Sequence, residues 1–230
     1  MSTSGFGGYA VVVPIRSLAT AKSRLRISET MRSQLVLAFF LDTVTALERS
    51  TAVERIVVVS SDAVIRSWVR GRCEIVADDE TGLPDAVDRG IERLRWVRHS
   101  GPVAVVLPDL PYATTEAFDV LFGAAREHVR AFLADDAGTG TTCVTAASTE
   151  AVLHRFGPNS ASAHAEAGLA ALDLPVPGLR TDVDVLADFR QLQAHWVGDA
   201  TNRVLNRWKI PVEQGCRDRK GRHAGLCIPR

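Results

Sequence analysis

Short apolar runs alternate with longer segments of helical periodicity in the first half of the chain. The runs are rich in β-branched residues, as expected for strands covered on both faces, and lie at 9–14, 55–60, 74–77 and 104–107. Apolar residues at helical spacing follow each run, in 28–48, in 62–70, after Pro84 and from Thr114 to Val129. This order predicts an α/β fold with a mostly parallel sheet and helices on both of its faces.

The order changes after the fourth helix. Short strands at 131–134 and up to Ala146 flank a turn, Asp135–Thr142, which predicts a small β-hairpin inserted into the fold. No internal repeat or long linker interrupts the pattern. We therefore expect one domain over residues 1–208, followed by a flexible tail at 209–230.

Composition narrows the class of protein. A chain of 230 residues with 46% hydrophobic residues can bury the core of one good-sized α/β domain. Its 27 basic and 27 acidic residues give no net charge, so no global basic field favours nucleic acid. The N-terminus lacks a secretory pattern, and the longest apolar run, Leu35–Leu41, is too short for a bilayer. We expect a cytoplasmic protein without a membrane partner.

Neither the cysteines nor the C-terminal tail indicates a metal site. Cys216, His223 and Cys227 match no zinc spacing, and the four cysteines of the chain form no Cys-x-x-Cys pair. The basic tail is interpreted as flexible or as a subunit contact in a homodimer, with nucleic acid a distant third.

Asp109 ends the fourth strand between two prolines. Ligands bind at the carboxyl edge of open α/β sheets, so this carboxylate is a candidate site residue. A turn former or helix cap is equally compatible with the local sequence.

A basic loop follows the first strand. Arg16, Lys22 and Arg24 are separated by small residues, an arrangement that suits an oligophosphate. The loop lacks the glycines and the Gly-Lys-Ser/Thr ending of a Walker loop. The alternative is a solvated basic loop.

Two further loops combine glycine with hydroxyl residues. Gly138–Thr142 can form an anion-binding concavity from successive amides and hydroxyls, or a flexible hairpin turn. Arg155–Ser160 is a second loop that can present amides and a hydroxyl to a small anion. Asp182 and Asp184 follow later, and in an extended segment both point to one side and can meet one cation.

Together these features indicate phosphoryl or nucleotidyl transfer with magnesium. Clustered carboxylates need a hard cation, and basic and amide-lined loops hold phosphates. No Ser-His-Asp order or reactive-thiol signature competes. The histidines at 128, 154, 164 and 195 are interpreted as surface or cap residues.

The ordered set of motifs resembles a known family. The chain is similar to the 2-phospholactate or phosphoenolpyruvate guanylyltransferases of deazaflavin coenzyme F-420 biosynthesis, a family related to the molybdopterin guanylyltransferases. This resemblance implies a single domain of the nucleotide-diphospho-sugar-transferase type, a Rossmann-like fold. The matching segments lie between residue 9 and about 207: Val13–Leu25, Asp42–Leu47, Leu107–Pro111, Gly138–Thr142, Arg155–Ser160 with His164, and Pro177–Asp184.

The resemblance also implies an activity: GMP is transferred from GTP to the phosphate of a small phosphorylated carboxylic acid, and pyrophosphate is released. The product would pass to the next biosynthetic enzyme. By position, Asp109, Asp182 and Asp184 resemble the Mg²⁺ ligands, and Lys22 also resembles a catalytic residue. Arg16, Lys22 and Arg24 resemble the contacts to the GTP phosphates, and Thr141, Gly157 and Ser160 the contacts to the acceptor.

Two positions depart from the family's pattern. Arg16 stands where lysine is usual, and Pro84 stands where asparagine is usual, near the expected nucleotide pocket. The choice of base therefore stays open. Another acceptor, such as 3-phosphoglycerate, a phosphonate or a sugar phosphate, or another nucleotide, is the alternative within this fold. A nucleotide-binding protein without catalysis is the alternative outside it.

Overall fold

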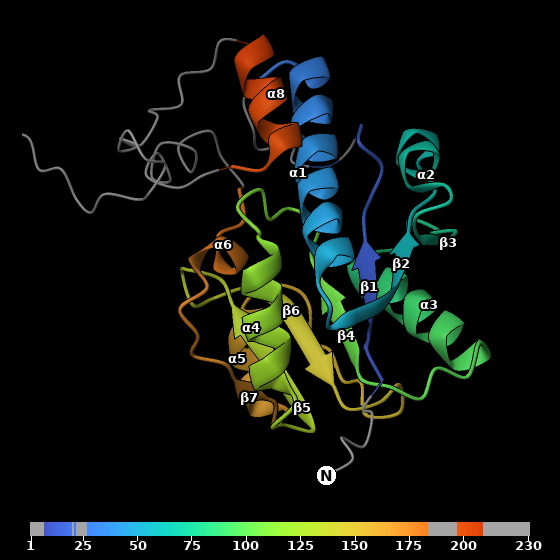
Figure 1. Ribbon diagram of the computed structural model, residues 1–230, viewed down its shortest axis with the longest axis vertical. Coiled ribbons are helices and arrows are strands. Elements are labelled where there is room, and N and C mark those ends of the chain that lie inside the picture. The colour runs from blue at the N-terminus through green and yellow to red at the C-terminus, as the bar shows by residue number, and fades with distance from the viewer. Residues whose placement is uncertain (1–6, 20, 22–26, 184–196, 209–230) are drawn as a thin grey trace, which may run out of the picture.

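The described part of the chain folds into one sheet with helices on both faces (Figure 1). The computed structural model describes residues 7–19, 21, 27–183 and 197–208. The sheet has seven strands in the order β3-β2-β1-β4-β6-β5-β7, and β6 runs antiparallel to both of its neighbours. The strands are β1 (Tyr9–Pro14), β2 (Val53–Val59), β3 (Glu74–Val76), β4 (Val103–Val106), β5 (Arg130–Ala134), β6 (Thr141–Ala146) and β7 (Ala170–Ala171).

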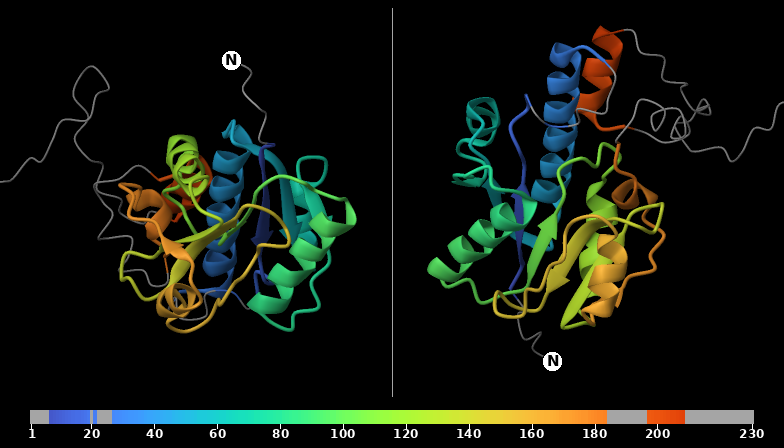
Figure 2. Two further views of the ribbon diagram at one scale, coloured as in Figure 1. Left: turned by 90° about the horizontal axis from the view of Figure 1, so that it is seen from below. Right: turned by 180° about the vertical axis from the view of Figure 1, so that it is seen from behind.

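The helices connect the strands and cover them. They are α1 (Glu29–Arg49), α2 (Ala63–Val69), α3 (Leu83–Trp96), α4 (Thr115–Ala125), α5 (Ser160–Glu166), α6 (Pro177–Arg180) and α8 (Asp199–Arg207). Figures 1 and 2 show α1 and α4 on one face of the sheet and α3 on the other. The predicted α/β fold is confirmed.

Side chains of β1 alternate between two cores. Tyr9, Val11 and Val13 pack with α1, α2, α4 and α6, whereas Ala10 and Val12 pack with α3 and α5. This two-sided burial explains why β1 is an uninterrupted apolar run, since both faces of a covered strand must be apolar.

Two predictions about the helices and the hairpin need correction. The inner face of α4 does not reach Val129, which is 67% exposed, because the helix ends at Ala125 and the chain turns into β5. The predicted hairpin is present as β5 and β6, but it is not an appendage, since β6 pairs with β4 within the main sheet. The tail at 209–230, with the Cys216, His223 and Cys227 group, lies outside the described residues.

Helix α8 is attached to α1 through a buried carboxylate. Asp42 accepts hydrogen bonds from the backbone N–H groups of Ala200 at 2.8 Å and Thr201 at 2.9 Å, at the N-terminus of α8. Burial raises the pKa of Asp42, and the two amides oppose that effect. Gly198 allows this approach, because an added Cβ would lie 2.2 Å from the carboxyl carbon of Asp42.

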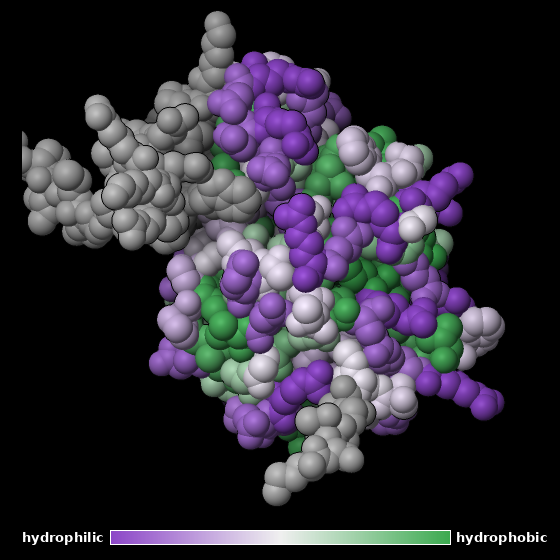
Figure 3. All heavy atoms as spheres, viewed as in Figure 1, coloured by the Kyte–Doolittle hydropathy of each residue, from purple (hydrophilic) through white to green (hydrophobic). Residues whose placement is uncertain are grey.

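The visible surface is mixed. On the face shown in Figure 3, hydrophilic residues are interspersed with small hydrophobic areas, as is usual for a protein surface. In the described part of the chain, no helix has both the length and the apolar character needed to cross a membrane.

Candidate active site

The order in which strands are added to the sheet reverses between β1 and β4. From β1 the chain adds β2 and β3 on one side, and then crosses to place β4, also parallel, on the other side of β1. At such a switch point the loops that leave the two strands diverge and leave a crevice at their carboxyl ends. Here those loops are the basic loop after Pro14 and the segment that contains Asp109.

Asp62 holds the basic loop against the end of β2. Its Oδ2 accepts a hydrogen bond from the backbone N–H of Leu18 at 2.9 Å. Its Oδ1 caps α2 by accepting from the N–H groups of Val64 at 2.9 Å and Ile65 at 3.2 Å. Arg16 is exposed on this loop, whereas Lys22 and Arg24 lie outside the described residues.

The backbone on either side of Asp109 is held by α1. The Thr43 hydroxyl, fully buried, accepts from the N–H of Leu110 at 3.3 Å and lies 3.3 Å from the carbonyl oxygen of Pro108. Asp109 itself is half-buried, and its Oδ1 is shielded from solvent. The carboxylate is therefore presented on a fixed backbone and not on a free loop.

Asp182 follows α6, which packs against the segment that carries Asp109. An added Cβ at Gly178 would lie 2.3 Å from the Tyr112 carbonyl oxygen, so only glycine permits this contact. Val183 belongs to the same buried cluster as Tyr112. The two segments thus pack together, with Asp182 half-buried.

The predicted carboxylate triplet is only partly described. Asp184 lies outside the described residues. Among the residues that the structure describes, no three His, Cys, Asp or Glu side chains gather closely enough to hold a metal ion. The predicted meeting of Asp109, Asp182 and Asp184 at one cation therefore stays a prediction.

The turn between β5 and β6 does not offer its amides to an anion. The Asp135 carboxylate accepts from the N–H of Thr139 at 2.9 Å and from the N–H of Gly140 at 2.8 Å. Of the two alternatives for this turn, these two amides therefore support the hairpin turn, because a carboxylate five residues or fewer away already occupies them. The Thr142 hydroxyl points back to the Leu133 carbonyl at 3.5 Å.

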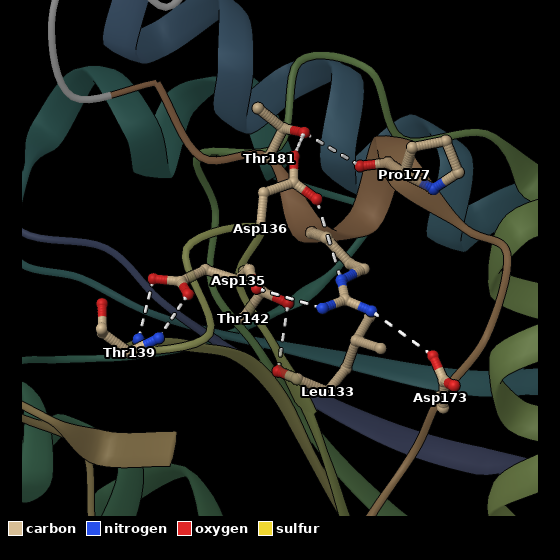
Figure 4. A network of polar contacts seen from close by, with 10 residues as sticks. Leu133, Asp135, Asp136, Thr139, Thr142, Asp173, Pro177 and Thr181 are labelled. Atoms are coloured by element: carbon tan, nitrogen blue, oxygen red, sulfur yellow. Dashed lines mark hydrogen bonds and ion pairs between the residues drawn. The ribbon is translucent and has the colours of Figure 1, made fainter. Parts of the chain in front are cut away.

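A polar network joins this turn to α6 (Figure 4). Arg180 donates to the carbonyl oxygen of Asp135 at 3.3 Å and lies 3.7 Å from the carboxylate of Asp136. Asp136 also donates its N–H to the Arg180 carbonyl at 2.9 Å and accepts from the Thr181 hydroxyl. The residue next to Asp182 is thereby fixed to the same edge of the sheet.

Thr141 and Ser160 come together around a buried histidine. Thr141, at the first position of β6, places its Oγ1 3.0 Å from Nδ1 of His164. Ser160 begins α5, one helical turn before His164, and both predicted acceptor contacts are buried. His164 is 0% exposed, so its interpretation as a surface or cap residue is wrong. Sequence spacing gave no signal for it, because its partner Thr141 is on a distant strand.

The loop before α5 is open where Gly157 lies. Gly157 has φ 149°, a conformation that favours glycine, and an added Cβ would meet no atom within 4 Å. Ala161 donates its N–H to the Thr139 carbonyl at 3.1 Å, which holds α5 to the edge where β6 begins. The third predicted acceptor contact therefore belongs to the same part of the molecule as Thr141 and Ser160.

Pro84 lies in the first turn of α3. A backbone N–H at this position has no partner within a helix, so proline costs the helix nothing. The departure from asparagine is therefore compatible with the fold.

The chain is similar to known proteins over most of its length. Phosphoenolpyruvate guanylyltransferase 2 of Rhodococcus jostii (strain RHA1) is 42% identical over 202 residues, which cover 88% of this chain and 92% of that protein. Phosphoenolpyruvate guanylyltransferase of Streptomyces scabiei (strain 87.22) is 38% identical over 212 residues, covering 88% and 98%.

A solved structure shows the same fold. The putative nucleotide-diphospho-sugar transferase from Desulfovibrio desulfuricans G20 superposes with a TM-score of 0.68 at 15% identity, covering 87% of this chain and 95% of that one. The family model described as "Guanylyl transferase CofC like" matches residues 9–216. The chain therefore belongs to the CofC-like guanylyl transferase family.

Proposed function

We propose that this protein transfers GMP from GTP to the phosphate of phosphoenolpyruvate, releasing pyrophosphate, in the biosynthesis of deazaflavin coenzyme F-420. Family membership and the names of the relatives support this activity. The observation that carries it is that the basic loop, the Asp109 segment and the Thr141–Ser160 pair all lie at one edge of the sheet. 2-Phospholactate is the second acceptor that fits the same chemistry.

The two substrates are both anions, so the site has to hold two negatively charged molecules next to each other. Arg16, Lys22 and Arg24 are assigned to the GTP phosphates, and Thr141, Gly157 and Ser160 to the acceptor. Asp109, Asp182 and Asp184 would hold Mg²⁺, since carboxylate oxygens are the ligands this hard cation prefers. The cation would neutralise charge on the phosphates as the α-phosphorus is attacked.

The reaction needs positioning more than acid–base chemistry. An oxygen of the acceptor phosphate forms a bond to the α-phosphorus of GTP, and the bond from that phosphorus to the β-bridging oxygen breaks. The attacking oxygen is already anionic, so no residue has to remove a proton from it. The residues therefore contribute by holding the two anions in line against their repulsion.

Pyrophosphate release from GTP tests the proposal. We expect rapid release with phosphoenolpyruvate, and slower or no release with 3-phosphoglycerate, a phosphonate or a sugar phosphate. If no phosphorylated acid caused pyrophosphate release from GTP, the proposal would be refuted. A preference for CTP, UTP or ATP over GTP would show that the base is chosen differently, with Pro84 as the first position to examine.

Replacing Thr141 with valine tests the acceptor site. Valine keeps the shape of the side chain and removes the hydroxyl, so we expect the KM for phosphoenolpyruvate to rise about tenfold while the KM for GTP is unchanged. Thr145→Val on the same strand is the matched control, because this buried hydroxyl only faces the Ala131 carbonyl at 3.5 Å. Equal effects of the two variants would contradict the assignment.

Replacing Asp62 with asparagine tests the basic loop. An amide oxygen can still cap α2, but the amide nitrogen then faces the N–H of Leu18, donor against donor. We expect the KM for GTP to rise several-fold with little change in the urea midpoint. Asp62→Ala, which removes the cap as well, should raise that KM and also cost about 1 kcal/mol of stability. An unchanged KM for GTP in both variants would show that this loop does not bind the nucleotide.

A further inference from the structure

His164 bridges the strand and the loop that carry the proposed acceptor contacts. Its Nε2 accepts a hydrogen bond from the backbone N–H of Arg155 at 2.8 Å, and its Nδ1 lies 3.0 Å from Oγ1 of Thr141. A backbone N–H can only donate, so Nε2 carries no hydrogen. In the neutral ring the hydrogen is therefore on Nδ1, which donates to the Thr141 hydroxyl oxygen.

This tautomer decides what the Thr141 hydroxyl can do. A hydroxyl has one hydrogen to donate, and its oxygen here already accepts from His164. Its own hydrogen is then directed away from the ring. An anion at the edge of the sheet is the kind of partner that a hydroxyl hydrogen in this position can bind.

We propose that His164 is a positioning residue of the acceptor site, which orients the Thr141 hydroxyl as a donor to the acceptor and anchors the 155–160 loop beside it. The inference rests on the proposed acceptor site. It adds a residue that touches neither substrate and acts through Thr141 and the backbone of Arg155.

The surroundings keep the ring neutral, as this role requires. Phe132 and Phe156 lie against it, with ring centroids 5.5 Å and 5.4 Å away. Burial lowers the pKa of His164 to about 4. A hydrogen bond to the backbone of Ser160 opposes this effect, and the charges of His154 and Arg155 reinforce it. A protonated ring would lose the acceptor for the Arg155 N–H, so a neutral ring is needed throughout the physiological pH range.

Two substitutions separate the two hydrogen bonds. The amide of asparagine can place a donor where Nδ1 lies, whereas glutamine can place an acceptor where Nε2 lies. For His164→Gln, which keeps a partner for Arg155 but not for Thr141, we expect the KM for phosphoenolpyruvate to rise about five- to tenfold. For His164→Asn we expect a rise of less than about threefold. The KM for GTP should be unchanged in both.

Comparison with Thr141→Val distinguishes this inference from the acceptor site itself. The double variant Thr141→Val/His164→Gln should be no worse for the acceptor than Thr141→Val alone, because both act through one hydroxyl. If Thr141→Val raises the acceptor KM and His164→Gln does not, the role of His164 is refuted while the site stands. If Thr141→Val has no effect, the site itself is misplaced.

A spectroscopic measurement on the unsubstituted protein does not depend on whether the variants fold. Nitrogen chemical shifts of the His164 ring should show a neutral Nδ1–H tautomer at pH 7 and protonation only near pH 4. An Nε2–H tautomer would overturn the inference directly. Because the pKa is lower in the folded state, the stability of the protein should fall as the pH drops from about 6.5 to 4, by at most about 1.4 kcal/mol per pH unit. This part of the slope should be absent from His164→Gln.

Discussion

Asp109→Asn is expected to lower kcat/KM by about three orders of magnitude while the protein stays folded. Asparagine has the same shape as aspartate but no negative charge, so it binds a divalent cation weakly. The backbone at this position is held by the Thr43 hydroxyl through Pro108 and Leu110, and none of those contacts involves the carboxylate. Steady-state pyrophosphate release over a range of Mg²⁺ concentrations measures the loss of activity. The urea midpoint of the same variant checks that the protein stays folded.

The matched control is Glu127→Gln, the same change from carboxylate to amide at an exposed position between α4 and β5. This position is at the opposite edge of the sheet, because β5 runs parallel to β4 and begins there. We expect it to leave activity unchanged. Full activity of Asp109→Asn would mean that the carboxylate is a turn former, which is the local alternative that its position between two prolines allows.

The sheet was predictable because its strands are covered on both faces. In β1 and β4 every residue is buried, so the apolar runs extend through the whole strand and give a clear signal. The short elements α5, β7 and α6 gave no such signal, since none of them contains a run of large apolar residues. They are specified by contacts that sequence spacing does not reveal, such as Gly178 against the carbonyl of Tyr112.

The candidate site was also predictable only in part. Thr141 and Ser160 could be singled out because the motifs around them resemble a family, and the structure brings them together through His164. The two alternatives for the hairpin turn could not be separated for a local reason: glycines and hydroxyls are typical of an anion site, but here the Asp135 side chain accepts from the same amides. Sequence alone does not distinguish a turn whose amides bind an external anion from a turn whose amides bind a carboxylate of the same turn.

Gly178→Ala is expected to lower activity about 10- to 100-fold, although residue 178 bears no functional group. A methyl group would lie 2.3 Å from the carbonyl oxygen of Tyr112, so α6 has to move away from the segment after β4. Asp182 lies two residues beyond the end of α6, and a misplacement of about 1 Å in a reacting constellation costs on the order of 100-fold. We also expect the Mg²⁺ concentration for half-maximal activity to rise, because Asp182 would move away from Asp109, its proposed partner in binding Mg²⁺.

Two controls make this expectation specific to the site. Gly123→Ala places the same methyl group in α4, where it meets no atom within 4 Å, and should leave activity unchanged and stability equal or up to about 1 kcal/mol higher. Ile91→Val, in the core on the other face of the sheet, should cost about 1 kcal/mol without changing the Mg²⁺ dependence. If Gly178→Ala behaves like Ile91→Val, the packing of α6 contributes only to stability, and the position of Asp182 has to be set by other contacts.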